Sequence, residues 1–149
     1  MRSSHLFIPL IGLIAFGCSS GGNYRMPAEW EPQSGVVLSD SASSELISQI
    51  GKENKIYKGD SPVIVLDKKG EKKLVVFDNT YPYDTTSAGL NFPIIKSPMV
   101  HTRRAMDTNG KGTFLLVEAF SIFHNPELGR DQQEEELKRT LGAEKMTSI

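Results

Sequence analysis

The feature that most constrains the fold is a pair of β-prone runs in the middle of the chain, separated by a tight turn. Residues 63–66 read Val-Ile-Val-Leu, residues 74–77 read Leu-Val-Val-Phe, and residues 67–70 between them read Asp-Lys-Lys-Gly. Branched and aromatic side chains favour strands, and a glycine-containing turn between two such runs predicts a β-hairpin. The fold must therefore contain a sheet.

Further strand patterns flank this hairpin. Residues 35–39 form a short apolar run of the length of a buried strand, and residues 113–120 predict a strand after a tight turn at residues 107–112. Residues 78–98 are rich in proline and polar turn residues and predict a long loop. A further strand is expected to start within residues 143–149.

Two helices complete the pattern. Ser43 or Ser44 can cap a short helix that Gly51 ends. A second helix is predicted over residues 131–141, because its first turn carries a capping-box-like acidic pattern and two leucines share one face. Gly142 stops this second helix. Helices mixed with strands place the chain in the α/β class.

Size and charge exclude several classes of protein. With 149 residues and 38% hydrophobic content, one domain is expected and a multi-spanning membrane protein is excluded. The net charge is −1, and the 17 basic side chains do not gather into a patch, so nucleic-acid binding is not expected. Three isolated histidines and one cysteine make no metal-ligand set, and no cofactor is expected.

The N-terminal residues predict an export signal. Residues 1–5 make a short positive start, residues 6–16 are apolar, and small residues lead to Cys18, the only cysteine. A bilayer core needs about 20 apolar residues, so this run is too short to span it, whereas the three-part pattern is typical of a secretory signal. The ending Ala-Phe-Gly-Cys resembles a bacterial lipobox.

We therefore expect residues 1–18 to be a lipoprotein-type signal peptide with Cys18 as the lipidated residue. A plain secretory signal and a buried N-terminal helix are the alternatives. Residues 19–25, rich in serine and glycine, predict a flexible tether, and residues 26–149 the folded domain. Such a protein would be exported and held on a bacterial cell envelope by a lipid anchor without spanning the membrane.

Two segments in the first half resemble the agmatine deiminases and bacterial peptidylarginine deiminases. The first is residues 26–32, Met-Pro-Ala-Glu-Trp-Glu-Pro, which holds the only tryptophan. The second is residues 56–70, which are similar to the family's Trp-x-Arg-Asp-x-Gly-Pro block and the hairpin after it. Aligned on Pro62, the family's arginine falls on Lys58 and its guanidinium-binding aspartate falls on Gly59.

Two later segments extend the resemblance in the same order. Residues 103–113 look like the family's Glu-Gly-Gly block and its Asp-Gly-x-Gly-Thr turn, but Arg103 and Arg104 replace the glycines and Thr102 replaces the acid before them. Residues 125–145 are similar to the family's Asn-Pro, acidic helix and Leu-Gly-x-Glu-Lys end.

The resemblance implies a pentein fold, a five-bladed α/β propeller of which this chain would hold about two blades, as the N-terminal part of a deiminase-like domain. It also implies a chemistry. A thiolate attacks the guanidinium carbon of agmatine or protein arginine, carboxylates hold the cation, and a histidine moves protons while ammonia leaves. With agmatine as substrate, the reaction serves putrescine biosynthesis.

The groups that this chemistry needs are missing from the sequence. No His-x-Asp pair occurs, and the only cysteine, Cys18, lies at the end of the predicted signal. We therefore predict no catalytic residue in this chain.

Three carboxylates lie near the family-like segments. Asp60 is the nearest substitute for the substrate-binding aspartate, but it is one residue out of register and would point to the opposite face of an extended segment unless the backbone bulges. Asp60, Asp84 and Glu118 are interpreted either as a residual guanidinium site or as solvated acids of turns and strand edges.

One basic cluster has two interpretations. His101 lies close in sequence to Arg103 and Arg104, which suggests either a patch for phosphate or carboxylate or three polar residues on an exposed loop. His124, next to an Asn-Pro pair, is interpreted as a turn residue.

Three functional hypotheses stay open, and the oligomeric state is unknown. The chain is a truncated or degenerate member of the deiminase family that is inactive by itself, a surface lipoprotein that binds an arginine-like ligand or a protein without turnover, or part of an enzyme that a second chain completes.

Overall fold

The computed structural model describes residues 22–39, 41–59, 62–78 and 90–149. The predicted signal peptide, the lipidated Cys18, and the carboxylates Asp60 and Asp84 lie outside the described residues. Within the described ranges, no helix is both long and apolar enough to cross a bilayer.

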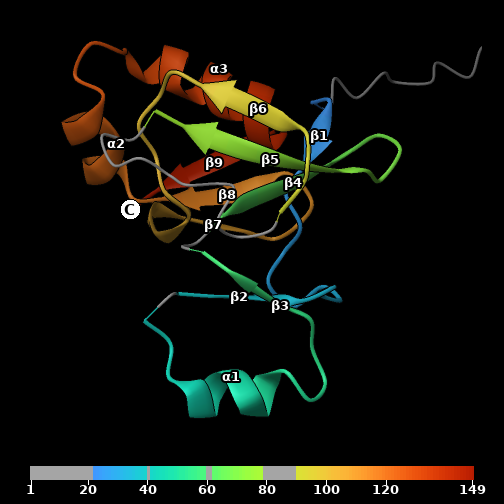
Figure 1. The fold of residues 1–149 in the computed structure, drawn as a ribbon. Coiled ribbons are helices and arrows are strands. Elements are labelled where there is room, and N and C mark those ends of the chain that lie inside the picture. The colour runs from blue at the N-terminus through green and yellow to red at the C-terminus, as the bar shows by residue number, and fades with distance from the viewer. Residues whose placement is uncertain (1–21, 40, 60–61, 79–89) are drawn as a thin grey trace, which may run out of the picture.

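The predicted hairpin forms the centre of a four-stranded sheet with the order β1-β4-β5-β6 (Figure 1). Strands β4 and β5 pair antiparallel, and β6 pairs with β5 in parallel. The bounds are Tyr24–Arg25 for β1, Val63–Asp67 for β4, Lys72–Phe77 for β5 and Ile94–Ser97 for β6.

The same arrangement recurs in a three-stranded sheet with the order β7-β8-β9. An antiparallel pair, β7 (Met106–Thr108) and β8 (Thr113–Leu116), is followed by a third strand, β9 (Lys145–Ser148), that lies parallel to β8. The predicted turn at residues 107–112 and the predicted C-terminal strand are thus confirmed. Both sheets thus contain an antiparallel pair whose second strand has a parallel neighbour that comes later in the chain.

The crossover between β8 and β9 contains the helices α2 (Glu118–His124) and α3 (Arg130–Leu141). The predicted strand over residues 113–120 is wrong beyond Leu116, because a short apolar run fits a strand or a buried helical turn equally well. Helix α3 begins one residue earlier than predicted, and the side chain of Gln132, not an acid, accepts a hydrogen bond from the Gly129 N–H at 2.9 Å.

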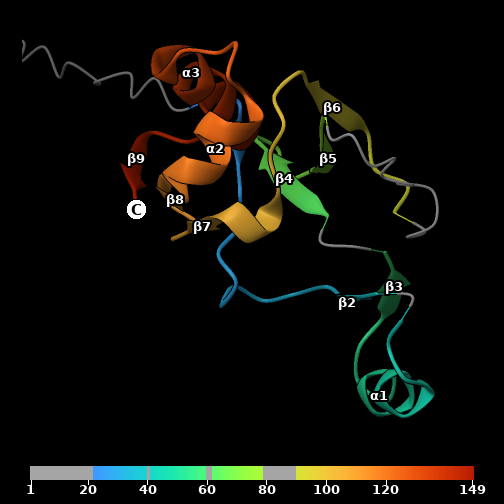
Figure 2. The same ribbon diagram turned by 90° about the vertical axis from the view of Figure 1, so that its left-hand side faces the viewer.

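A smaller strand–helix–strand unit projects from the two sheets (Figures 1 and 2). Strands β2 (Val36–Leu38) and β3 (Ile56–Lys58) pair in parallel, and α1 (Ser44–Ile50) connects them. Ser43 caps α1 by accepting a hydrogen bond from the Leu46 N–H, and Gly51 ends the helix, as predicted. No residue of α1 is buried, and β2 is only half-buried, so the prediction of a buried strand there is wrong.

The core lies between the two sheets and α3. Its largest fully buried side chains include Phe114, Met99, Leu137 and Leu141. Side chains alternate across a strand, so only one face of the hairpin packs into this core. The buried residues of this face are Val63, Val65, Val75 and Phe77.

Two predicted boundaries are corrected by this packing. The residues expected to be a tether include β1, whose two residues pair with Asp67 and Leu66 of β4, so the folded part begins before residue 26. The segment expected to be a loop over residues 78–98 contains β6, whose pairing with β5 a local pattern does not reveal. The described residues form a mixed α/β fold and no closed propeller.

His101 is fully buried, and both interpretations of its cluster as a surface feature are wrong for this residue. Its ring lies 5.5 Å from that of Phe77 and 5.8 Å from that of Phe120. Met99 and His101 are buried while Val100 and Thr102 are half-exposed, which is the alternation of an extended segment with one face in the core. Burial lowers the pKa of His101 to about 4.

Acid should therefore destabilise the fold through His101. Its imidazole has a pKa near 6.5 when unfolded and about 4 when folded, so the unfolded state binds the proton first as the pH falls. The stability that the neutral ring contributes is complete above pH 6.5 and is lost between pH 6.5 and 4, which corresponds to about 3 kcal/mol.

Urea denaturation across this pH range tests the prediction. His101→Leu should remove most of the acid-dependent loss, whereas His124→Gln, at the exposed end of α2, should leave it in place. An equal loss of stability in wild type and His101→Leu would contradict the prediction.

Gly142 should be the least replaceable residue at the end of α3. Its φ of 70° is left-handed, and an added Cβ would lie 1.7 Å from the carbonyl oxygen of Tyr24 in β1. Gly142→Ala should therefore cost more than the roughly 1–2 kcal/mol of a left-handed alanine, because β1 must also move. Gly70→Ala is the matched control, since Gly70 has a φ of 80° with nothing within 4 Å of the added carbon. Equal unfolding free energies for the two variants in urea would refute this role.

Candidate functional site

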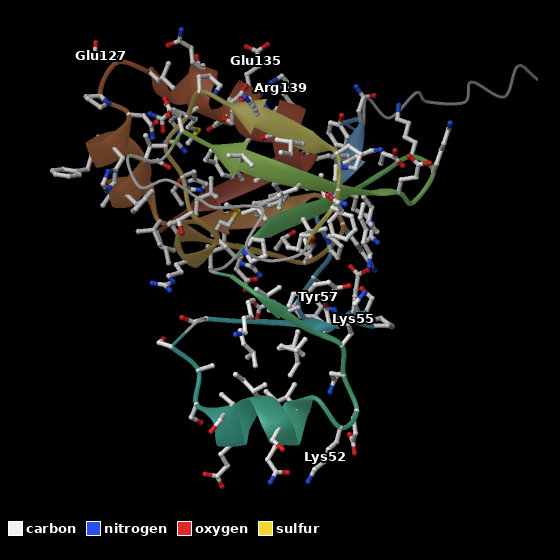
Figure 3. The ribbon with its side chains drawn as sticks, viewed as in Figure 1. Lys52, Lys55, Tyr57, Glu127, Glu135 and Arg139 are labelled. Atoms are coloured by element: carbon white, nitrogen blue, oxygen red, sulfur yellow. The ribbon has the colours of Figure 1, made fainter. Side chains whose placement is uncertain are left out.

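A cavity of about 510 Å³ lies between the β2–β3 unit and the four-stranded sheet. It has the size of a small-molecule site. Its floor is the second face of the hairpin. Ile64, Leu66 and Lys72 line the cavity, while the valines of the first face lie in the core. Tyr57 of β3 forms part of the opposite wall, with Lys55 beside it at 4.9 Å from the ring centre (Figure 3).

One wall of the cavity is formed by the segment that carries the Met-Pro-Ala-Glu-Trp-Glu-Pro pattern. The Glu31 N–H donates to the Ala28 carbonyl at 3.2 Å, which closes a tight turn. The Glu31 carboxylate accepts hydrogen bonds from the Ala28 N–H at 2.9 Å and from the Arg25 guanidinium at 2.6 Å. The hydrogen bond from Arg25 lowers the pKa of Glu31, so this carboxylate is ionised and paired.

The same turn is attached to the block that contains the two adjacent arginines. Arg25 also donates to the Gly110 carbonyl at 3.1 Å. Arg103 donates to the Glu29 carboxylate at 2.7 Å and to the Met106 carbonyl at 2.6 Å. An arginine that stands where the resembled family has a glycine therefore holds a carboxylate at the edge of the cavity.

Trp30, the only tryptophan, lies outside this network and is 72% exposed. Its two neighbours in sequence, Glu29 and Glu31, supply the carboxylates of the cavity wall. The resemblance of this heptad was visible in the sequence, but its role as the link between the N-terminal segment and residues 103–110 was not, because each bond joins residues distant in sequence.

Lys72 is the cavity residue that sequence reasoning missed. Its ammonium group donates a hydrogen bond to the Ser34 hydroxyl and lies 5.8 Å from the ring centre of Phe92. The adjacent Lys73 points to the other face, where it pairs with Glu71 at 3.0 Å and Asp67 at 3.4 Å. The two lysines look alike in sequence, and only the strand alternation separates them.

Of the carboxylates proposed as a residual guanidinium site, the structure describes only Glu118. It is the first residue of α2 and pairs with Arg130 at 3.3 Å on the surface. It borders a second, mainly apolar cavity of about 250 Å³ near Ile122 and Leu137, and it does not line the first one. Its position matches that of a solvated acid. A role for Asp60 or Asp84 in a residual guanidinium site stays a prediction, since both lie outside the described residues.

The histidines of the described ranges are not placed for proton transfer in the larger cavity. His101 is buried between two phenylalanines, and His124 ends α2, where its ring packs 4.3 Å from that of Phe120. Within the part of the chain that the structure describes, no group of three His, Cys, Asp or Glu side chains is arranged to hold a metal ion.

Neither a family model nor a curated protein matches the sequence. Solved structures do share its fold. A provisionally assigned peptidyl-arginine deiminase matches with a TM-score of 0.67 and 17% identity, and a provisionally assigned arginine deiminase from Porphyromonas gingivalis with 0.68 and 14%. In both matches, 85% of this chain and 57% of the other are covered.

The agmatine deiminase of Enterococcus faecalis matches with a TM-score of 0.62 and 18% identity, covering 85% of this chain and 53% of that one. The present chain thus spans little more than half the length of these structures. At such identities the likeness establishes the fold alone: the described residues have a mixed α/β fold similar to that of the deiminases.

Proposed function

We propose that this chain is a member of the agmatine and peptidylarginine deiminase family that does not itself hydrolyse a guanidinium group. The family part of the proposal is supported by the fold and by the four resembling segments, whose order along the chain is that of the family. Agmatine and protein arginine are the substrate class that membership of this family implies.

The proposal that the chain is inactive rests on the pairing of the carboxylates that line the cavity. A deiminase needs a free carboxylate to hold the substrate cation, a sulfur nucleophile and an imidazole within hydrogen-bond reach. Here Glu29 is bound by Arg103 and Glu31 by Arg25, and His101 is enclosed in the core. Among the described residues, both carboxylates that line the cavity are thus paired with guanidinium groups of the chain itself.

We also propose that the protein is exported and anchored on a bacterial cell envelope through Cys18. The support is the order of a positive start, an apolar centre and a lipobox-like ending in the first 18 residues. A lipid anchor holds a protein at a membrane surface without a spanning helix.

Incubation of the purified chain with agmatine, and separately with an arginine-containing peptide, should yield no ammonia and no carbamoyl or citrulline product. An authentic agmatine deiminase serves as the positive control. The Cys18→Ser variant identifies contamination, because any product formed equally by this variant does not come from a Cys18 thiolate. Product that forms with the wild type and disappears in Cys18→Ser would overturn the proposal of inactivity.

The anchoring proposal predicts covalent labelling by an alkyne-bearing fatty acid during expression of the full chain in a bacterial host. The labelled protein should fractionate with membranes. Cys18→Ser should lose the label, and Ser19→Ala, one residue further on, should keep it. A wild-type chain that is secreted without label would show that the plain secretory signal is the correct alternative.

A further inference from the structure

The charges around the larger cavity do not suit a cationic ligand. Of the residues that the structure describes, two carboxylates line it, and each is neutralised by a guanidinium group at 2.6 to 2.7 Å. A guanidinium ligand would have to share its carboxylate with Arg25 or Arg103, whose charge already neutralises it. These two carboxylates are therefore paired parts of the cavity wall, and their charge attracts a second cation less than that of an unpaired acid would.

Lys72 lines the cavity, and no carboxylate of the described residues forms an ion pair with its ammonium group. Its hydrogen-bond partner is the neutral hydroxyl of Ser34, and its other contact is the ring of Phe92. The adjacent Lys73 differs, because two carboxylates pair with its ammonium group on the other side of the same strand. An ammonium group that donates to one hydroxyl has two further donors to offer.

The rest of the lining is largely apolar. Aliphatic side chains come from β2 and from the hairpin, and aromatic rings come from β3 and from the segment before β6. These residues are Val36, Val37, Ile64, Leu66, Tyr57 and Phe92. A cavity with apolar walls and few convergent polar groups is the usual form of a small-molecule site, in which the polar groups fix orientation.

We propose that this cavity binds an organic carboxylate with an apolar body, held by an ion pair to the Lys72 ammonium group. The apolar body lies between the hairpin face and the β2–β3 unit. This ligand is opposite in charge to the guanidinium compounds that the related fold suggests. Binding at this site does not depend on whether the chain hydrolyses a substrate.

Three probes of one shape and different charge, together with agmatine, test the site, with isothermal titration calorimetry as the measurement and Trp30 fluorescence as a second readout. They are 4-phenylbutyrate, its neutral amide, 4-phenylbutylamine and agmatine. The carboxylate should bind most tightly, the amide weakly, and the two cations least. Tighter binding of either cation than of the carboxylate, or no measurable binding of the carboxylate at millimolar concentration, overturns the proposal.

Substitutions of Lys72 test whether its ammonium group holds the ligand carboxylate. Lys72→Met keeps the aliphatic stem and should weaken binding of 4-phenylbutyrate by about tenfold, the loss of one charge-assisted contact. Lys72→Arg should restore most of the affinity, and Lys68→Met, in the exposed turn of the hairpin, should leave it unchanged. Binding of the neutral amide should be the same in Lys72→Met as in wild type, which separates loss of charge from misfolding.

Two outcomes of the substitutions contradict the site. One is unchanged 4-phenylbutyrate affinity in Lys72→Met, and the other is an equal loss in Lys68→Met. Added salt provides an independent check, because the wild-type affinity for the carboxylate should fall with ionic strength and that of the Lys72→Met variant should not. Failure here leaves the hydrolysis assay unaffected, since that assay measures product from a different substrate.

Discussion

The alternation of side chains along the β4–β5 hairpin is the constraint on which the rest of the structure depends. Val63, Val65 and Val75 face the core, while Ile64, Leu66 and Lys72 face the cavity. A slip of one residue in the pairing would exchange the two sets and remove the three valines from the core. The register therefore decides at once where the core lies and which lysine borders the candidate site.

The second determinant is the set of ion pairs that attaches the N-terminal segment to residues 103–110. Exposed ion pairs add little to stability, so their importance here is positional. They hold the heptad turn against the second sheet and form one wall of the cavity. They also neutralise both carboxylates of that wall. A fold similar to that of the deiminases thus encloses a cavity in which, among the described residues, Lys72 has a charge that no carboxylate pairs.

Local sequence signals succeeded where they act over a few residues. The hairpin, the Ser43 cap of α1 and the left-handed end of α3 at Gly142 all follow from side-chain branching, capping or backbone freedom. The signals failed where a distant strand decides the outcome. Strand β6 pairs in parallel with β5, and residues 118–120 belong to the helical connection that leads from β8 to its parallel partner β9.

By itself, the sequence determined the α/β class, the resemblance to the deiminases and the absence of a His-x-Asp pair, because these depend on composition, short motifs and local periodicity. Only the tertiary structure decided that His101 is enclosed in the core, that Arg103 binds Glu29, and that Lys72 and Lys73 face opposite environments. Burial and charge pairing are set by contacts between segments far apart in the chain, and no local pattern encodes them.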